Sequence, residues 1–234
     1  MIKGIKKCKK SWLCSAMDIR QIEISLKSPN AQDRLRALTA LREYGSDVAV
    51  PLLTSKLKDP EFLVRSFVAM GLGNKRTDES YAALLNLMQF DTDPNVRAEA
   101  SNSLSKYGDV SISHLVTTFQ QDDHWLVRRS ILAALVEMSC PEELYTICIC
   151  GLAGEDPTVR EAGIDALGLL AGTIKQTEAL HQILALKDAQ WWRIRMHVAR
   201  ALKRFDSPDA KAALGELMKD EEHRVVAAAL DSSL

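Results

Sequence analysis

The stretch Asp-Pro-Thr-Val-Arg-Glu-Ala-Gly-Ile-Asp-Ala-Leu-Gly at 156–168 is one copy of a unit that recurs along the chain. The arginine of this unit follows a valine here and in three other copies, and follows isoleucine or a polar residue in the rest. The seven arginines stand at steps of 31, 32, 31, 32, 35 and 29 residues: Arg34, Arg65, Arg97, Arg128, Arg160, Arg195 and Arg224. A period near 32 that persists over seven copies predicts an array of two-helix units.

Apolar periodicity and capping residues predict two helices in each unit. The expected first helices span 18–27, 47–58, 78–90, 110–120, 141–152, 175–187 and 208–219. The expected second helices span 31–44, 61–72, 94–107, 124–138, 157–170, 190–204 and 221–231. We expect N-caps followed by a first-turn proline at Asp59-Pro60, Asp93-Pro94 and Asp156-Pro157. We expect left-handed glycines to end three second helices at Gly73, Gly108 and Gly172.

The recurring Val-Arg pair has a structural interpretation. The valine, or Ile194, is expected to be the first buried residue of each second helix, and a leucine eight places later is expected to close the layer. The arginines are expected to bind the aspartates of the inter-helix turns and so form a ladder from unit to unit. We therefore predict a structural role, and neither a catalytic nor a nucleic-acid-binding one, for Arg65, Arg97, Arg128, Arg160 and Arg195.

The pattern Asp-Pro-x-Val-Arg-x-x-Ala-x-x-Ala-Leu-Gly at this period resembles the HEAT repeat, and more narrowly the phycobilisome-lyase HEAT-like repeat. The resemblance implies an all-α, right-handed α-solenoid of about seven helix pairs. It also points to phycobilin lyase subunits, phycobilisome-turnover proteins, a partner of an iron–sulfur carrier, and adaptors. Deoxyhypusine hydroxylases use similar repeats, but they bind iron through His-Glu dipeptides. This chain contains no His-Glu dipeptide, so we exclude an iron-hydroxylase site of that kind.

Composition and hydropathy argue against two further classes of protein. The net charge is −1, whereas a general nucleic-acid-binding protein is normally basic, so a nucleic-acid partner is not expected. No apolar run approaches the length of about 18 residues that a membrane-spanning helix needs. Residues 1–16 hold five lysines and no acid. We expect them to form a flexible basic tail before one repeat domain at 17–234, with a start at Met17 or a weak contact with an anionic surface as alternatives.

The cysteines and histidines show no recognisable catalytic or metal motif, and no cofactor is predicted. Five cysteines without Cys-x-x-Cys spacing fit free thiols in a reducing compartment. We expect them to behave mainly as small apolar residues. The alternative is a thiol that binds a bilin, an iron–sulfur intermediate or a redox partner.

Aromatic residues mark the copies that deviate from the consensus. In the three units with a long inter-helix turn, an aromatic residue stands two places before the valine or isoleucine: Phe62, Trp125 and Trp192. Units with a short turn have proline there. We expect these aromatics either to line one rim of the solenoid as a partner-binding row or to fill the gap that each longer turn opens.

The densest deviation lies between Asp188 and Asp206. This segment has two adjacent tryptophans, five arginines and lysines, one histidine, and no acid between its ends. Helical spacing places four basic side chains on one face: Arg193, His197, Arg200 and Arg204. Beside Trp191 and Trp192, this face is either a solvated surface or a site for an acidic protein segment, a tetrapyrrole propionate or a phosphate. A smaller version is expected two units earlier at His124, Trp125 and Arg129.

These features favour a non-catalytic protein-interaction scaffold that binds a partner on its concave face or on its Trp/Arg-rich rim. The expected partner is another protein, such as a phycobiliprotein or another acidic protein. A bilin lyase-type or phycobilisome-turnover factor is the first alternative, and a partner of an iron–sulfur carrier is the second. The family resemblance implies a cytoplasmic location, in a cyanobacterial cytosol or a plastid stroma.

Overall fold

The computed structural model describes residues 17–231, which form fourteen α-helices in seven consecutive pairs. The first helices of the pairs are α1 (Ile19–Leu26), α3 (Ser46–Thr54), α5 (Asp78–Phe90), α7 (Ile112–Gln121), α9 (Pro141–Ala153), α11 (Gln176–Leu184) and α13 (Pro208–Leu217). The second helices are α2 (Ala31–Ala40), α4 (Phe62–Lys75), α6 (Pro94–Ser105), α8 (Trp125–Val136), α10 (Pro157–Gly168), α12 (Trp192–Leu202) and α14 (His223–Leu230). Two short 3₁₀ helices complete the set, η1 (Leu41–Glu43) and η2 (Gly108–Ser111).

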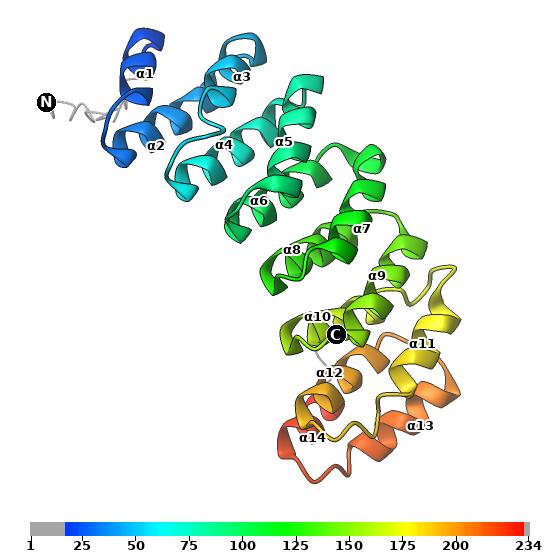
Figure 1. Ribbon diagram of the computed structural model, residues 1–234. Helices are drawn as coiled ribbons and strands as arrows, with labels where there is room; N and C mark the ends of the chain where they lie inside the picture. Colours follow the sequence, from blue (N-terminus) through cyan, green and yellow to red (C-terminus); the bar gives the residue numbers. More distant parts are fainter. Residues whose placement is uncertain (1–16, 232–234) are drawn as a thin grey trace, which may run out of the picture.

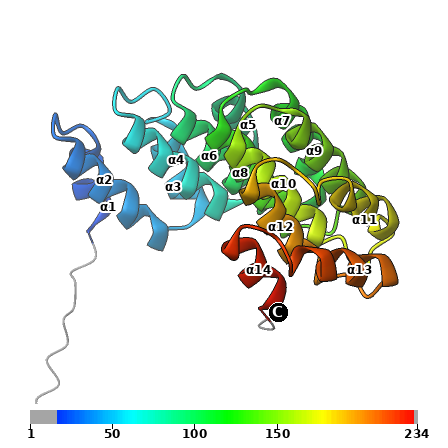
Figure 2. The same cartoon turned by 90° about the horizontal axis from the view of Figure 1, so that it is seen from below.

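The predicted all-α, right-handed solenoid is confirmed. Figure 1 shows two rows of helices along a curved stack, in which the second helices line the concave side and the first helices the convex side. Each second helix contacts the next one along the row from α2 to α14. Figure 2, turned by 90°, shows the pair α1 and α2 at one end and the pair α13 and α14 at the other. The predicted basic tail at 1–16 lies outside the described residues.

The recurring aliphatic residues form the core, as expected. The valine or isoleucine that precedes the repeat arginine is at most 1% exposed in five second helices: Val64, Val96, Val127, Val159 and Ile194. The leucines eight places later are fully buried: Leu72, Leu104, Leu135, Leu167 and Leu202. Burial of each such side chain contributes about 1.5–3 kcal/mol, so the repeated aliphatic positions stabilise every layer of the stack.

The helix starts follow the predicted caps in two of three cases. The carboxylates of Asp93 and Asp156 accept hydrogen bonds from backbone N–H groups at the starts of α6 and α10, and the predicted prolines occupy the first turns. The prediction for Asp59 is wrong, because α4 begins only at Phe62 and the proline after Asp59 lies before the helix. The carboxylate of Asp59 is buried and accepts instead from Arg34 of the preceding unit at 2.8 Å.

Two of the three predicted left-handed glycines are confirmed. Gly108 and Gly172 have φ angles of 75° and 79°. The prediction for Gly73 is wrong, because Gly73 lies inside α4 and the left-handed residue that ends this helix is Arg76, with a φ of 51°. A Cβ atom at position 73 would stand 2.6 Å from the Cβ atom of Ser103, so this glycine permits the close approach of α4 and α6.

An arginine–aspartate ladder connects neighbouring units, as predicted for Arg65, Arg97 and Arg195. The ion pairs are Arg34–Asp59, Arg65–Asp91, Arg97–Asp122 and Arg195–Asp220, with shortest N–O distances of 2.6–2.8 Å. In the last three pairs Nε and Nη2 bind the two carboxylate oxygens in parallel. These side chains are largely shielded from water, so the ladder helps to define the register between repeats.

The ladder does not continue through Arg128 and Arg160, which corrects the prediction for these two residues. Within residues 17–231, neither arginine forms an ion pair. Asp156 is engaged in capping α10, and Asp188 is exposed and binds Lys187. The sequence offers an aspartate in each turn, but only an aspartate at the right position in the turn can reach the preceding arginine.

Candidate partner-binding surface

Three aromatic side chains begin alternate second helices. Phe62, Trp125 and Trp192 are the first residues of α4, α8 and α12. Phe62 and Trp125 are 42% and 41% exposed, whereas Trp192 is half-buried and packs against the core. The predicted equivalence of the three positions therefore holds, but only the first two aromatics present a large apolar surface to solvent. The guanidinium of Arg224 in α14 lies over the ring of Trp192 at 4.6 Å, so Trp192 contacts the next unit.

The cluster at the start of α8 is held by a histidine cap. Nδ1 of His124 accepts a hydrogen bond from the backbone N–H of Leu126 at 3.2 Å, which fixes the ring at the helix N-terminus. The imidazole stacks on Trp125 with 6.0 Å between ring centroids and 25° between ring planes. Arg129 lies one turn further along and is exposed, and it forms no side-chain interaction with the described residues. This arrangement presents a fixed aromatic surface next to Arg129, a cation that forms no ion pair with the described residues.

The basic segment at the start of α12 carries less free charge than its sequence suggests. Arg193 lies beside both tryptophan rings, 5.6 Å from Trp191 and 6.0 Å from Trp192. Its Nε and Nη2 atoms also bind the carboxylate of Glu161 in α10 at 2.6 and 3.0 Å. Arg193 is therefore a bridge between α10 and α12, and Trp191, which is 38% exposed, remains the accessible aromatic of this cluster.

His197 does not belong to the exposed basic face, which corrects the prediction of a continuous stripe. It is 9% exposed, and its Nδ1 atom lies 2.7 Å from the carboxylate of Asp165, while Nε2 lies 3.6 Å from Glu161. These acids lie 32 and 36 residues earlier in the chain, on the neighbouring helix α10. Only the packing of α10 against α12 brings them to the histidine.

The remaining members of the predicted stripe are accessible. Arg200 and Arg204 are exposed and have no ion-pair partner among residues 17–231. Together with Lys203 they line a recess of about 320 Å³, to which two acids, Asp165 and Asp231, also contribute. The ten predicted residues thus fall into one cluster at the start of α8, a second cluster along α12 and its two ends, and the separate Phe62. Within the second cluster, Trp192 is half-buried and His197 is buried.

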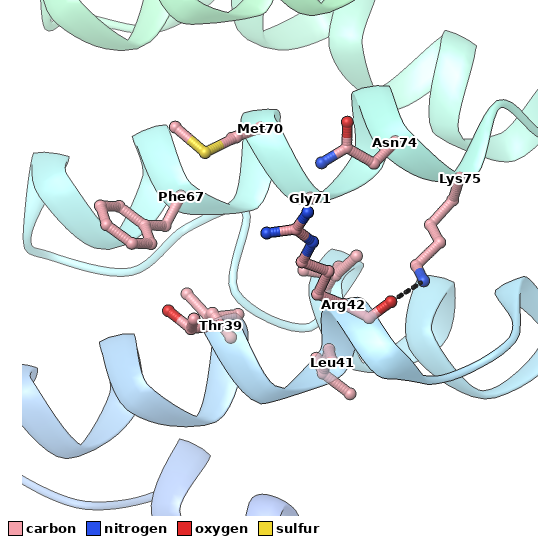
Figure 3. A pocket seen from close by; sticks show the side chains of 10 residues that line it. Thr39, Leu41, Arg42, Phe67, Met70, Gly71, Asn74 and Lys75 are labelled. Atoms are coloured by element: carbon pink, nitrogen blue, oxygen red, sulfur yellow. Dashed lines mark hydrogen bonds between the residues drawn. The ribbon is translucent and has the colours of Figure 1, made fainter. Parts of the chain in front are cut away.

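A pocket between α2 and α4 was not predicted from the sequence. It encloses about 140 Å³, and Figure 3 shows Phe67 and Met70 of α4 on one side and Thr39 and Arg42 from the α2 side on the other. Met70 is 41% exposed. The residue that could have indicated this pocket is Gly71. A Cβ atom at this position would stand 2.7 Å from a methyl group of Leu53, so the absence of a side chain leaves room beside α4.

The described cysteines are free thiols, and two of the three are buried. Cys140 and Cys148 are buried and Cys150 is half-buried, in agreement with the expectation of small apolar residues. Burial raises the pKa of Cys140 to about 11 and raises the pKa of Cys148 further. A nucleophile or metal ligand requires a thiolate, so this environment disfavours both roles for these two thiols. Within residues 17–231, no three His, Cys, Asp or Glu side chains are grouped so that they could hold a metal ion, and no helix could span a membrane.

Comparison with known proteins agrees with the architecture. Residues 21–89, 55–136 and 149–234 match the family of HEAT repeats. The bilin biosynthesis protein PecF of Nostoc is 25% identical over 57% of this chain and 82% of its own length. The deoxyhypusine hydroxylase of Schizosaccharomyces pombe is 31% identical over 44% of this chain, but the alignment spans only 32% of that enzyme. The X-ray structure of Escherichia coli YibA superposes with a TM-score of 0.64 at 18% identity, covering 97% of this chain and 87% of the other. Because the family match extends over most of its length, this chain belongs to the HEAT-repeat family.

Proposed function

We propose that this protein is a non-catalytic interaction scaffold that binds a partner protein along its second helices and their N-terminal ends. A stack of helix pairs exposes a long curved surface, which suits it to hold an extended or curved partner. The observation that best supports this proposal is the cluster at the start of α8, which consists of Trp125, the stacked His124 and Arg129. Tryptophan and arginine are enriched among residues that dominate binding energy at protein interfaces.

The exposed cations indicate the charge of the partner. Arg129, Arg200 and Arg204 are exposed on α8 and at the end of α12 and form no ion pair within the described residues. An acidic partner would gain from all three, and complementary charge increases the rate and specificity of association. We therefore favour an acidic protein over a neutral one.

Affinity capture from cells that express the protein tests this function. Trp125→Ala and Arg129→Glu should each reduce the recovered partner, by about tenfold or more if this cluster is a binding hot spot of at least 1.4 kcal/mol. Phe90→Ala is the matched control, because Phe90 is 71% exposed but ends the convex-row helix α5. Equal recovery of the same partner by wild type and both α8 variants would contradict this placement of the site.

A second candidate is a factor that handles a bilin or a phycobiliprotein. The similarity to PecF supports it, since PecF is named for bilin biosynthesis and aligns over most of its own length. Titration of the purified protein with phycocyanobilin, followed by absorption spectroscopy and gel filtration, tests it. A spectral shift with co-elution supports bilin handling. An unchanged spectrum, together with no binding to a phycobiliprotein subunit, would contradict it.

A further inference from the structure

Two contacts define the position of three of the four ladder aspartates; the fourth, Asp220, stands four residues before Arg224 and binds Arg195 through its carboxylate. In three units the acid stands six residues before the arginine of its own unit: Asp59, Asp91 and Asp122. Its backbone carbonyl accepts a hydrogen bond from that arginine, at 2.8, 3.0 and 2.6 Å respectively. Its carboxylate binds the arginine of the preceding unit. The residue six places before the repeat arginine is therefore the joint between two units.

The next two units have no carboxylate at this joint. The equivalent residues are Gly154, six places before Arg160, and Ala189, six places before Arg195. The backbone contact persists at Ala189, whose carbonyl accepts from Nη1 of Arg195 at 2.9 Å. At Gly154, an added Cβ atom would stand 3.5 Å from Nη1 of Arg128, so a side chain at this position would point towards that arginine. The backbone at Gly154 and Ala189 is therefore placed as in the other joints, but neither residue has a carboxylate to bind the preceding arginine.

Arg160 is the arginine that this substitution leaves without an acceptor. Its side chain forms no hydrogen bond or ion pair with residues 17–231, and its Nε atom is buried without a hydrogen-bond partner. Nε of Arg34 is also unpartnered, but other nitrogens of that guanidinium bind Asp59 and backbone carbonyls. Arginine stays charged under all ordinary conditions, so Arg160 places an uncompensated positive charge at the surface of the stack.

A cavity adjoins this guanidinium. It has a volume of about 510 Å³ and is lined by Arg160, Ala189, Gln190, Trp191 and Ile194. The small side chain of Ala189 leaves the space that an aspartate would occupy, and Trp191 supplies an aromatic wall. Space, charge and an apolar wall are together what a short acidic side chain requires for recognition by arginine.

We propose that Arg160 binds the carboxylate of an aspartate or glutamate side chain of the partner protein, which completes the ladder from outside the chain. This inference rests on the proposed scaffold function and specifies the chemistry of the partner at one site. Arg128 offers the same chemistry one repeat earlier, because its guanidinium lies 5.5 Å from the centre of the Phe119 ring and pairs with no acid among the described residues. An extended partner segment with two acidic residues would engage both.

Two variants test the site from opposite directions. Ala189→Asp supplies the carboxylate from within the chain, and Arg160→Gln removes the donor. The probe is a fluorescein-labelled peptide of about ten glutamates, with binding measured by fluorescence anisotropy at low salt and at about 0.15 M salt. Both variants should weaken binding by about tenfold, which corresponds to about 1.4 kcal/mol. Arg36→Gln, which removes an exposed arginine of α2, is the matched control and should bind like the wild type.

Several outcomes overturn the proposal. These are a wild type that does not bind the peptide at low salt, an Ala189→Asp variant that binds it as tightly as wild type, or an Arg36→Gln variant weakened as much as Arg160→Gln. Binding of glutarate at millimolar concentration, measured by calorimetry, without binding of the peptide would assign the site to a small carboxylate instead of a protein. Thermal unfolding gives a second readout, because Ala189→Asp should raise Tm if its carboxylate reaches Arg160, and an unchanged Tm contradicts the geometry.

Affinity capture separates this inference from the scaffold function. If Ala189→Asp loses the cellular partner together with Trp125→Ala, both proposals are supported. If Trp125→Ala loses the partner and Ala189→Asp retains it, the scaffold function stands and the role of Arg160 is wrong. If Ala189→Asp loses the partner and Trp125→Ala retains it, the placement of the scaffold site at the start of α8 is wrong while the role of Arg160 stands. If both variants retain the partner, both placements are wrong.

Discussion

A close contact between α4 and α6 gives a prediction that can be worked out in detail. Gly73 of α4 faces Ser103 of α6, and an added Cβ atom would stand 2.6 Å from both Cβ and Oγ of Ser103 and 3.0 Å from its Cα atom. Real Cβ atoms do not approach other heavy atoms this closely, and the obstacle includes backbone. The two helices must therefore separate if Gly73 is replaced by alanine.

The expected effect is the difference between two opposing contributions. A glycine-to-alanine change in a helix gains up to about 1 kcal/mol from helix propensity. Overpacking of a well-packed contact costs about 1–3 kcal/mol. The steric cost should dominate, so Gly73→Ala should lower the free energy of unfolding by about 1–2 kcal/mol. Gly215→Ala in α13 should do the opposite, because nothing lies within 4 Å of its added Cβ atom.

Urea unfolding followed by far-UV circular dichroism measures both variants. The double variant with Gly73→Ala and Ser103→Gly should recover stability relative to the sum of the single changes, because the second change removes the obstructing Cβ atom. A coupling energy near zero would contradict the contact. So would a stabilisation by Gly73→Ala equal to that by Gly215→Ala, since it would mean that α4 and α6 are further apart than described.

Three further predictions concern charge and reactivity. The hydrogen bonds from Arg195 lower the pKa of Asp220, so this pair stabilises the fold above the ordinary carboxyl pKa of about 3.8 and loses its effect as pH falls through the folded value. Asp220→Asn should cost roughly 3 kcal/mol at pH 7, and the difference between its urea midpoint and that of wild type should decrease as pH falls below about 3.8. Iodoacetamide followed by peptide mass spectrometry should label Cys150 before Cys148, and the reverse order would contradict their burial. His197→Ala should destabilise the fold by about 1–2 kcal/mol in thermal unfolding, whereas a freely solvated histidine would leave Tm unchanged.

Much of the candidate surface was predictable because it depends on local position. An aromatic residue two places before the buried valine or isoleucine begins a second helix, and this placed Phe62 and Trp125 correctly on the exterior. Whether a charged side chain is exposed or paired could not be predicted in this way, because its partner comes from another repeat. His197 reads as one member of a basic stripe in sequence, and only the acids of α10 turn it into an interior hydrogen-bonded group. The pocket beside Gly71 likewise depends on Leu53 and α2, which the sequence of α4 does not reveal.

The sequence by itself determined the repeat, the number of helix pairs and the buried face of each second helix. These follow from a regular period and from the removal of aliphatic side chains from water, and both are visible residue by residue. The tertiary structure decided which acid meets which arginine. Asp91 rather than Asp93 binds Arg65, and Gly154 and Ala189 interrupt the ladder at Arg128 and Arg160. An ion pair depends on distances of a few ångströms between groups about 25 residues apart, and only the stacking of the repeats sets those distances.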